Sequence, residues 1–143
     1  MSKKCRVLYL SYDGLTDPLG QSQILAYTSR INKEKGIDYD IISFDKPENF
    51  EKNGSRVREI LKNTSIQWHS LKYHKSPPII STVYDLREGW KKIKELYRKN
   101  HYDVVHCRGY MSAILGQKVK KKYGTKFIFD MRGWWPDEKL ESG

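Results

Sequence analysis

Four polar side chains in the last third of the chain have types and spacings that could do chemistry together. They form two pairs, His106 with Arg108 and Asp130 with Arg132. Each pair comes at the end of an apolar run typical of a buried strand, where interior packing does not require polar residues. Arginine presents a planar fork of donors to phosphate or carboxylate, and aspartate accepts hydrogen bonds from ligand hydroxyl groups. We therefore take all four as candidate catalytic residues.

Single members of this set also have structural explanations. His106 could bond a neighbouring backbone group, and Arg132 could form an ordinary ion pair with Asp130. The set as a whole favours function, because several polar groups at the ends of central strands serve no packing purpose. The structural explanations stay open for each residue taken alone.

A glycine-bearing loop near the start of the chain is the second candidate. Its sequence, Asp-Gly-Leu-Thr-Asp-Pro-Leu-Gly-Gln-Ser-Gln at positions 13–23, stands between an apolar run and a segment of helical periodicity. Its glycines permit positive φ and close ligand approach, and an aspartate before a proline is a common helix start. Free N–H groups and the helix dipole can bind an anion there. The candidate residues of this diphosphate- or acceptor-binding loop are Asp13, Gly14, Asp17, Gly20 and Gln21.

The spacing of this loop matches neither of two common phosphate-binding motifs. The dinucleotide motif requires G-x-G-x-x-G, and the P-loop requires Gly-Lys followed by Ser or Thr. On spacing alone, an ordinary turn between a strand and a well-capped helix is the better explanation.

Five strands and four helices must position these residues. Hydrophobic patterns predict strands over residues 6–11, 39–44, 66–71, 102–107 and 126–130. They predict helices over residues 22–35, from Pro47, from a capping pair of Thr82 and Asp85, and between the fourth strand and Gly124. The side chains expected on the inward helix faces are Ile24, Tyr27, Thr28, Ile31, Phe50, Val57, Ile60, Leu61, Val83, Leu86, Trp90, Ile93, Tyr97, Met111, Ile114, Leu115 and Val119.

Strands that alternate with helices indicate an α/β fold with parallel pairing. We predict a Rossmann-like parallel sheet with strand order 3-2-1-4-5 and helices on both faces. Ligands of such sheets bind beyond the carboxyl ends of the strands, where the strand order reverses. That crevice lies between the first and fourth strands, so Gly14, His106 and Asp130 should border it along one edge of the sheet.

The composition fits a soluble globular domain. The chain has 143 residues, 38% hydrophobic and 31% charged, which suffices for one domain with a real core. No apolar run is long enough to span a membrane, and the first residues lack a signal-peptide core, so we expect a cytoplasmic protein. Cys5 and Cys107 fit no zinc spacing, and they should lie at opposite ends of neighbouring strands, too far apart for a disulfide. No metal-ligating pattern is seen.

The formal net charge of +10 calls for a partner hypothesis. Cations gather over residues 91–99 and 118–122. These cations either form solvated helix faces or attract the phosphates of nucleic acid, anionic lipid or a phosphorylated substrate. Ten Tyr and four Trp raise the possibility of nucleic acid. Most of these aromatics fall on inward helix positions or strands, so no nucleic-acid partner is expected.

Four segments resemble one enzyme family. They are the loop of residues 13–23, Tyr-His-Lys-Ser-Pro-Pro at 73–78, Asp-Val-Val-His-Cys-Arg-Gly-Tyr at 103–110 and Lys-Phe-Ile-Phe-Asp-Met-Arg-Gly-Trp-Trp at 126–135. Together they resemble the N-terminal, acceptor-binding domain of family-4 retaining glycosyltransferases, enzymes of the GT-B fold. Many members carry a His-x-His-like pair at the end of the fourth strand, whereas this chain has Arg108 at the second position.

The resemblance implies transfer of a sugar, with retention, from a nucleotide-sugar donor to a glycan, lipid-linked or small-molecule acceptor. It implies that no metal or other cofactor is needed and that the glycine loop approaches the donor diphosphate. Family members hold the nucleotide sugar with a second Rossmann-like domain, so residues 1–143 are expected to be a truncated N-terminal domain that acts only within the two-domain protein. A lipid-linked acceptor would bring a peripheral contact at the inner face of the membrane, through a basic face that Lys118 and residues 120–122 are expected to form beside the crevice.

A stand-alone flavodoxin-like module that binds phosphate or a nucleotide is the alternative. A phosphoryl receiver of that class needs acidic residues after its first and third strands and a lysine after its fifth. Here the third strand ends in Ser-Leu-Lys and the fifth in aspartate. A flavin site would favour a loop rich in Ser and Thr, whereas this loop carries aspartates and a proline.

Overall fold

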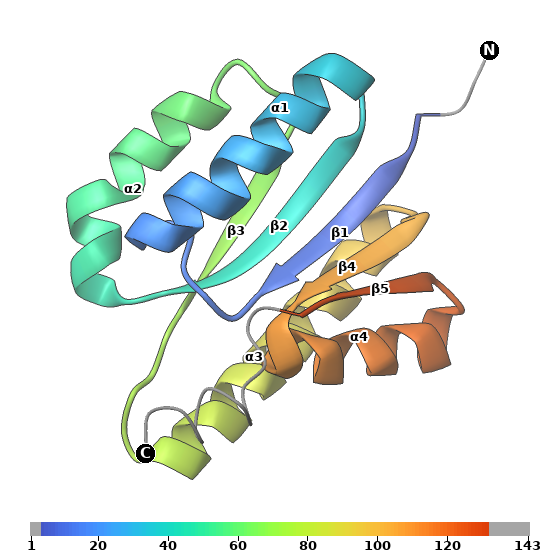
Figure 1. Ribbon diagram of the computed structural model, residues 1–143. Helices are drawn as coiled ribbons and strands as arrows, with labels where there is room; N and C mark the ends of the chain where they lie inside the picture. The colour runs from blue at the N-terminus through green and yellow to red at the C-terminus, as the bar shows by residue number, and fades with distance from the viewer. Residues whose placement is uncertain (1–3, 132–143) are drawn as a thin grey trace.

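The computed structural model describes residues 4–131 (Figure 1). In chain order the elements are β1 (Arg6–Ser11), the π-helix η1 (Gly20–Leu25), α1 (Ala26–Lys35), β2 (Asp38–Asp45), α2 (Pro47–Leu61), β3 (Gln67–Lys72), α3 (Pro78–Lys99), β4 (Val104–Arg108), α4 (Gly109–Tyr123) and β5 (Lys126–Asp130). The predicted strands agree with these bounds to within two residues at every end.

The five strands form one parallel sheet in the order β3-β2-β1-β4-β5, which confirms the predicted topology. This order is that of Rossmann-like sheets, whereas flavodoxin-like sheets have the order 2-1-3-4-5. The fold is therefore α/β and Rossmann-like, and the sheet order does not fit the flavodoxin-like alternative.

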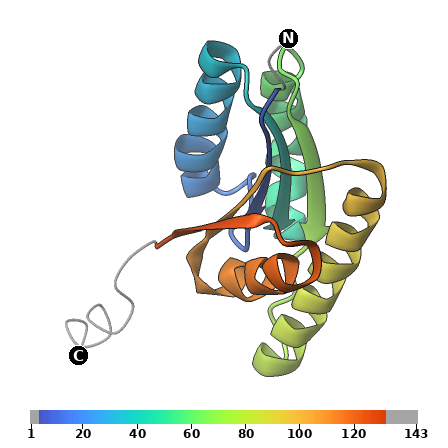
Figure 2. The ribbon, with the colours of Figure 1, turned by 90° about the vertical axis from the view of Figure 1, so that its right-hand side faces the viewer.

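Helices cover both faces of the sheet, as predicted. Figure 2 shows the sheet between α1 on one side and α3 on the other. Alternating side chains of β1 divide between two apolar cores: Leu8 and Leu10 pack on the α3 and α4 side, and Val7 and Tyr9 on the α1 and α2 side. This alternation also decides which polar side chains share a face at the strand ends.

Two helices, α1 and α4, end at the glycines that were predicted to stop them. Gly36 and Gly124 follow α1 and α4 with φ of 67° and 72°, a left-handed conformation that glycine adopts without strain. The predicted start of α3 is wrong, because the helix begins at Pro78 and Thr82 lies inside it. The hydroxyl of Thr82 donates to the carbonyl oxygen of Pro78 at 2.8 Å, and Asp85 is fully buried instead of capping.

Four residues predicted to face inward are exposed instead: Tyr27 (54%), Ile60 (40%), Val83 (61%) and Ile114 (48%). Small residues such as Thr28, Gly54 and Ser112 are buried on α1, α2 and α4. The buried face of each of these helices is therefore narrower than the hydrophobic pattern indicated. Val83 lies near the start of α3, which projects beyond the sheet in Figure 1.

Both cysteines are free thiols, as predicted. Cys5 precedes β1, whereas Cys107 pairs in register with Leu10 near the other end of that strand. Burial raises the pKa of the Cys107 thiol to about 12, so it is an unreactive core residue. Within residues 4–131, every helix is too short or too polar to cross a membrane.

Candidate functional site

The carboxyl ends of β1, β4 and β5 meet at one edge of the sheet. Ser11, Arg108 and Asp130 are neighbours in register there. Gly14, His106 and Asp130 therefore lie toward the same edge, as predicted. On the face that also carries α1, the structure gathers a set of polar side chains, which we call the crevice cluster: Asp13, Gln23, His106, Arg108 and Asp130.

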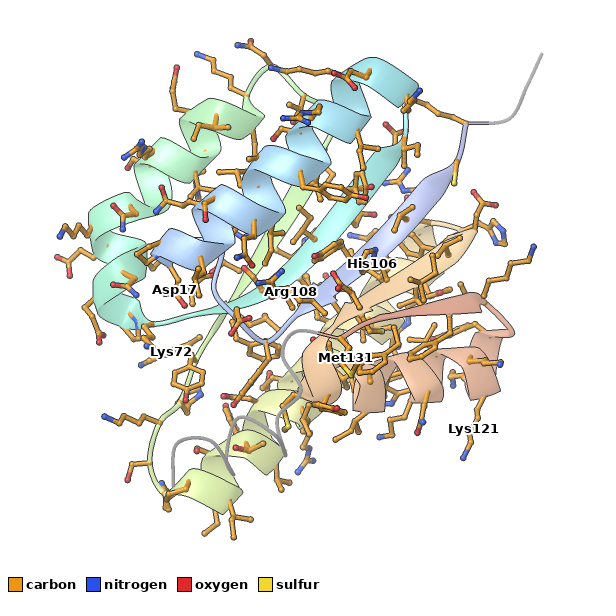
Figure 3. All side chains as sticks on the ribbon, in the orientation of Figure 1. Asp17, Lys72, His106, Arg108, Lys121 and Met131 are labelled. Carbon is orange, nitrogen blue, oxygen red and sulfur yellow. The ribbon has the colours of Figure 1, made fainter. Side chains whose placement is uncertain are left out.

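Arg108 is the centre of the crevice cluster (Figure 3). Its side chain is only 3% exposed, although it carries a permanent charge. Its Nε donates to Asp13 Oδ2 at 3.4 Å and its Nη2 to Gln23 Oε1 at 2.5 Å. Its Nη1 is buried and has no hydrogen-bond partner within residues 4–131. Within residues 4–131, the carboxylate that pairs with this buried guanidinium is that of Asp13, which is 61% exposed, so the cation is incompletely compensated there.

The imidazole of His106 lies between an aromatic ring and a carboxylate. It stacks on Tyr9 with 4.5 Å between ring centroids, and its Nε2 is 3.2 Å from Asp130 Oδ2. The side chains of His106 and Asp130 are 18% and 22% exposed, so a ligand can reach both. Ile128, on the same face, is 48% exposed, so the helices in the described part of the chain leave the β5 end of this face uncovered.

The glycines of the loop do not have the predicted role. A Cβ on Gly14 would lie 2.7 Å from Asp45 Oδ1 and 3.0 Å from the Phe44 carbonyl oxygen. A Cβ on Gly20 would lie against the Gly14 carbonyl oxygen and 3.0 Å from the Cα of Leu15. Neither glycine has positive φ. Protein atoms, not open space for a ligand, occupy the positions that the missing side chains leave.

Acceptors within the protein already occupy several N–H groups of this loop. The Thr16 N–H and hydroxyl donate to Asp45 Oδ1 at 2.9 and 2.8 Å, and the Gly14 N–H donates to Asp17 Oδ2 at 3.3 Å. Asp45 is 2% exposed and also accepts the hydroxyls of Ser43 and Ser70. The expectation of free N–H donors for an anion is wrong for these groups, because Asp45 of β2 already accepts from Thr16 and Asp17 already accepts from Gly14.

Asp17 and Gln21 also brace the loop rather than face the crevice. Asp17 Oδ1 accepts from Asn49 on α2 at 2.6 Å, and Gln21 Nε2 donates to the Thr16 carbonyl oxygen at 3.0 Å. The helical turn does begin at Pro18, as predicted. Of the nine predicted site residues, Asp13, His106, Arg108 and Asp130 come together. Gly14, Asp17, Gly20 and Gln21 shape the loop, and Arg132 lies outside the described residues.

Sequence analysis missed three residues that matter here: Tyr9 under His106, Gln23 on Arg108, and Asp45 under the loop. Only Asp45 carried a signal, since a carboxylate at the end of an apolar strand is the pattern that identified Asp130. Beside Asp45, a pocket of about 330 Å³ opens at the carboxyl ends of β2 and β3, apart from the crevice cluster.

The basic run on α4 is not beside the crevice. A helix that connects parallel strands runs back along the sheet, so α4 starts at the carboxyl edge and ends at the opposite edge. Lys118 and residues 120–122 lie in its last turns. Figure 3 shows Lys121 far from Arg108. The expectation that these lysines flank the site is therefore wrong.

No family model and no curated protein matches this sequence. Among solved structures, the chain is similar to the C-terminal domain of a hydrogenase from Pyrococcus furiosus, with a TM-score of 0.63 and 15% identity. The match covers 92% of this chain and 94% of that chain. At this identity the likeness shows a shared fold alone.

Proposed function

We propose that the crevice cluster binds the diphosphate of a nucleotide sugar, and that the chain is the acceptor-side domain of a glycosyltransferase. The observation that carries this proposal is the buried guanidinium of Arg108, whose Nη1 has no partner within the described residues. Orphaned buried donors are rare in native proteins, and a second anion would satisfy this one. The resemblance of four chain segments to family-4 glycosyltransferases supplies the reaction.

The chemistry of sugar transfer fits a fixed cation at this place. When the bond between the anomeric carbon and the diphosphate breaks, negative charge grows on the leaving group. A guanidinium held by Asp13 and Gln23 stabilises that charge without reorganising. Asp13 is exposed and its carboxylate lies 3.4 Å from the guanidinium, where an anionic ligand would displace it.

The remaining members of the cluster suit the hydroxyl groups of a sugar. Asp130 can accept from a hydroxyl, and His106, stacked on Tyr9, offers a ring of fixed orientation beside it. The loop of residues 13–23 takes a revised role in the proposal. It holds Asp13 and Gln23 against Arg108 and does not itself cradle the diphosphate.

We expect Arg108→Gln to weaken nucleoside diphosphate binding at least tenfold, or about 1.4 kcal/mol, because the buried charge is lost. Asp13→Asn should instead strengthen binding several-fold, because it removes the competing carboxylate. Dissociation constants are measured by calorimetry with inorganic diphosphate and a panel of nucleoside diphosphates. Arg98→Gln, in the last turn of α3, is the matched control. Circular dichroism monitors folding.

Three outcomes separate the possibilities. Opposite changes in Arg108→Gln and Asp13→Asn support the proposed site, since a folding defect would weaken binding in both. Unchanged affinity in Arg108→Gln overturns the site. A full-length protein could also bind diphosphates but never release nucleoside diphosphate from nucleotide sugars. That result would mean that the site belongs to a binding module and not to a transferase. Residues 1–143 alone should transfer no sugar, because half a donor site loses the positioning on which rate depends.

A lipid-linked acceptor is favoured by the first two turns of α3. Four large apolar side chains are exposed there: Ile79 (80%), Ile80 (67%), Val83 (61%) and Tyr84 (49%). These turns lie at the carboxyl edge, the same edge as the crevice cluster, and Lys72 and Lys75 precede them in sequence. An apolar surface with flanking cations suits the interface of an anionic membrane.

We expect the chain to bind vesicles that contain anionic lipid more tightly than neutral vesicles, and added salt to weaken that binding. The double change Ile79→Ser and Ile80→Ser should reduce the partition coefficient at least tenfold, because each isoleucine loses roughly 1.5–3 kcal/mol of burial. Co-sedimentation measures the partition. Ile114→Ser, an exposed isoleucine on α4, should leave it unchanged. Equal binding by the double variant and the wild type would contradict the membrane contact.

A further inference from the structure

Strand β5 forms one border of the sheet, and its outer edge is open in the described part of the chain. It pairs with β4 on one side and is the last strand in the order β3-β2-β1-β4-β5, so no strand within residues 4–131 pairs with its other side (Figure 1). Alternate residues of such a strand turn their N–H and C=O groups outward. This edge can therefore pair with another strand.

Exposed apolar side chains lie beside this edge on both faces of the sheet. Ile128 is 48% exposed on the face that carries α1, and Phe129, on the opposite face, is 39% exposed. Tyr110 and Met131 are also exposed and extend the surface around Phe129. The Tyr110 ring lies 5.4 Å from that of Phe129 between centroids, and its hydroxyl is 3.5 Å from the Met131 Sδ. A contiguous apolar surface beside an open strand edge indicates an interaction site.

The sequence of β5 is complementary to itself when a second copy of the strand runs antiparallel. It reads Lys-Phe-Ile-Phe-Asp, with a cation at its start and a carboxylate at its end. When Ile128 lies opposite Ile128 of the second copy, Lys126 of each copy lies opposite Asp130 of the other. Phe127 lies opposite Phe129 in the same way. Opposite charges and aromatic rings that face each other across antiparallel strands stabilise the pair.

Other arrangements of two β5 strands lose these pairs. A parallel arrangement in register would place Lys126 opposite Lys126 and Asp130 opposite Asp130, and like charges that face each other destabilise a pair. An antiparallel arrangement shifted by two residues, in either direction, would place the apolar Ile128 opposite a charged side chain. The alternation of side chains along β5 therefore specifies one register. In that register a twofold axis relates the copies, so one patch that contacts itself closes the assembly as a dimer.

We propose that the chain forms a homodimer through antiparallel pairing of β5 with β5 of a second copy, with Ile128 at the twofold axis. The two sheets join into one continuous sheet, and the outward N–H and C=O groups of each edge find partners in the other copy. The pairing also brings Lys126 of the second copy to Asp130 of the crevice cluster, so each site gains a cation from the other copy. The dimer does not depend on the proposed function, since it forms without a ligand.

Charge reversal at the two ends of β5 tests the pairing in solution. Sedimentation equilibrium of the wild type should show monomers in equilibrium with a dimer of twice the 16.9 kDa chain mass. Lys126→Asp and Asp130→Lys should each raise the dissociation constant of the dimer about tenfold, because like charges then face each other at both ends. Combining both changes in one chain should restore the dimer, and mixing the two single variants should give a heterodimer.

Two comparisons separate this result from other causes. A general effect of net charge would change the dissociation constant in opposite directions in the two single variants, and a folding defect would not be reversed by the second change. Lys33→Asp, on α1, makes the same change in charge far from β5 and should leave the dimer unaffected. Circular dichroism monitors folding.

Disulfide trapping tests the register. In a Cys5→Ser background, Ile128→Cys should form a disulfide between two copies, because directly opposite residues of antiparallel strands lie within disulfide reach. Lys126→Cys, in the same strand, should not, since the two copies of that position would be roughly 13 Å apart along the strand direction. Non-reducing electrophoresis after mild oxidation measures both variants.

Equal cross-linking at both positions would overturn the proposed pairing. A wild type that stays monomeric at every concentration would also overturn it and would leave the edge to residues 132–143, which follow β5 directly in the chain. Neither result bears on the diphosphate site, which Arg108→Gln tests separately.

Discussion

Gly20→Ala is expected to unfold the chain or to lower its free energy of unfolding by more than about 3 kcal/mol. The added Cβ would meet the Gly14 carbonyl oxygen, and it would lie 2.9 Å from the Gly14 carbonyl carbon and 3.0 Å from the Leu15 Cα. All three are backbone atoms, which cannot turn away as a flexible side chain does. The loop is also tied down by Asp45, so the clash has nowhere to relax.

Gly54→Ala is the matched control and should have the opposite sign. Gly54 is buried in the middle of α2, but a Cβ there would only touch the Phe50 ring at 3.7 Å. Alanine is the better helix former by about 0.5–1 kcal/mol, so stability should rise. Urea unfolding followed by circular dichroism measures both variants. A Gly20→Ala protein as stable as the wild type would mean that the loop does not have this conformation.

Asp40→Ala is expected to lower the free energy of unfolding by about 3–5 kcal/mol, the usual cost of breaking a buried ion pair. The Asp40 side chain is 1% exposed. Its Oδ2 accepts from Arg6 Nε and Nη2 at 3.3 and 3.1 Å and from the Tyr102 hydroxyl, and His69 Nε2 lies 3.6 Å from its Oδ1. Removing the carboxylate leaves the Arg6 guanidinium and the buried Tyr102 hydroxyl without their acceptor.

The same residue makes stability depend on pH. Burial alone raises the pKa of Asp40, but the contacts with His69, Tyr102 and Arg6 outweigh burial and hold the pKa below its ordinary value. A lowered folded-state pKa gives stability that is complete above the unfolded value of about 3.9 and is lost as the pH falls through the folded value. The stability difference between wild type and Asp40→Asn should therefore shrink below about pH 4.

Asp38→Asn is the control for this pH dependence. Asp38 lies two residues away in the same strand, is 22% exposed and pairs with the exposed Lys4 at 3.2 Å. Its replacement should cost less than about 1 kcal/mol. Urea unfolding at a series of pH values measures all three proteins. A gap between wild type and Asp40→Asn that stays constant down to pH 2 would contradict the account of Asp40.

Local patterns in the sequence were enough to predict the fold. Apolar runs such as residues 6–11 and 126–130, separated by segments of helical periodicity, predicted the strands. The rules for parallel strands joined by helices then predicted the correct strand order. The same reasoning brought His106, Arg108, Asp13 and the Asp130 carboxylate to one edge. Strand ends meet at that edge in any sheet of this topology, so no side-chain detail was needed.

Only the tertiary structure decided which partners the polar groups of the loop and of α3 have. The loop glycines suggested a ligand site because Asp45, whose carboxylate binds the loop, is 29 positions from its partner Thr16. Local sequence does not reveal a contact over that separation. Tyr12 and Asp85 are 73 positions apart, and no periodicity links them. The hydrophobic periodicity of a helix or strand indicates which of its sides is buried. A hydrogen bond between two elements depends on register, helix placement and side-chain direction together. Those quantities are settled only when the whole chain packs, and so the fold followed from the sequence while the partners of each polar group did not.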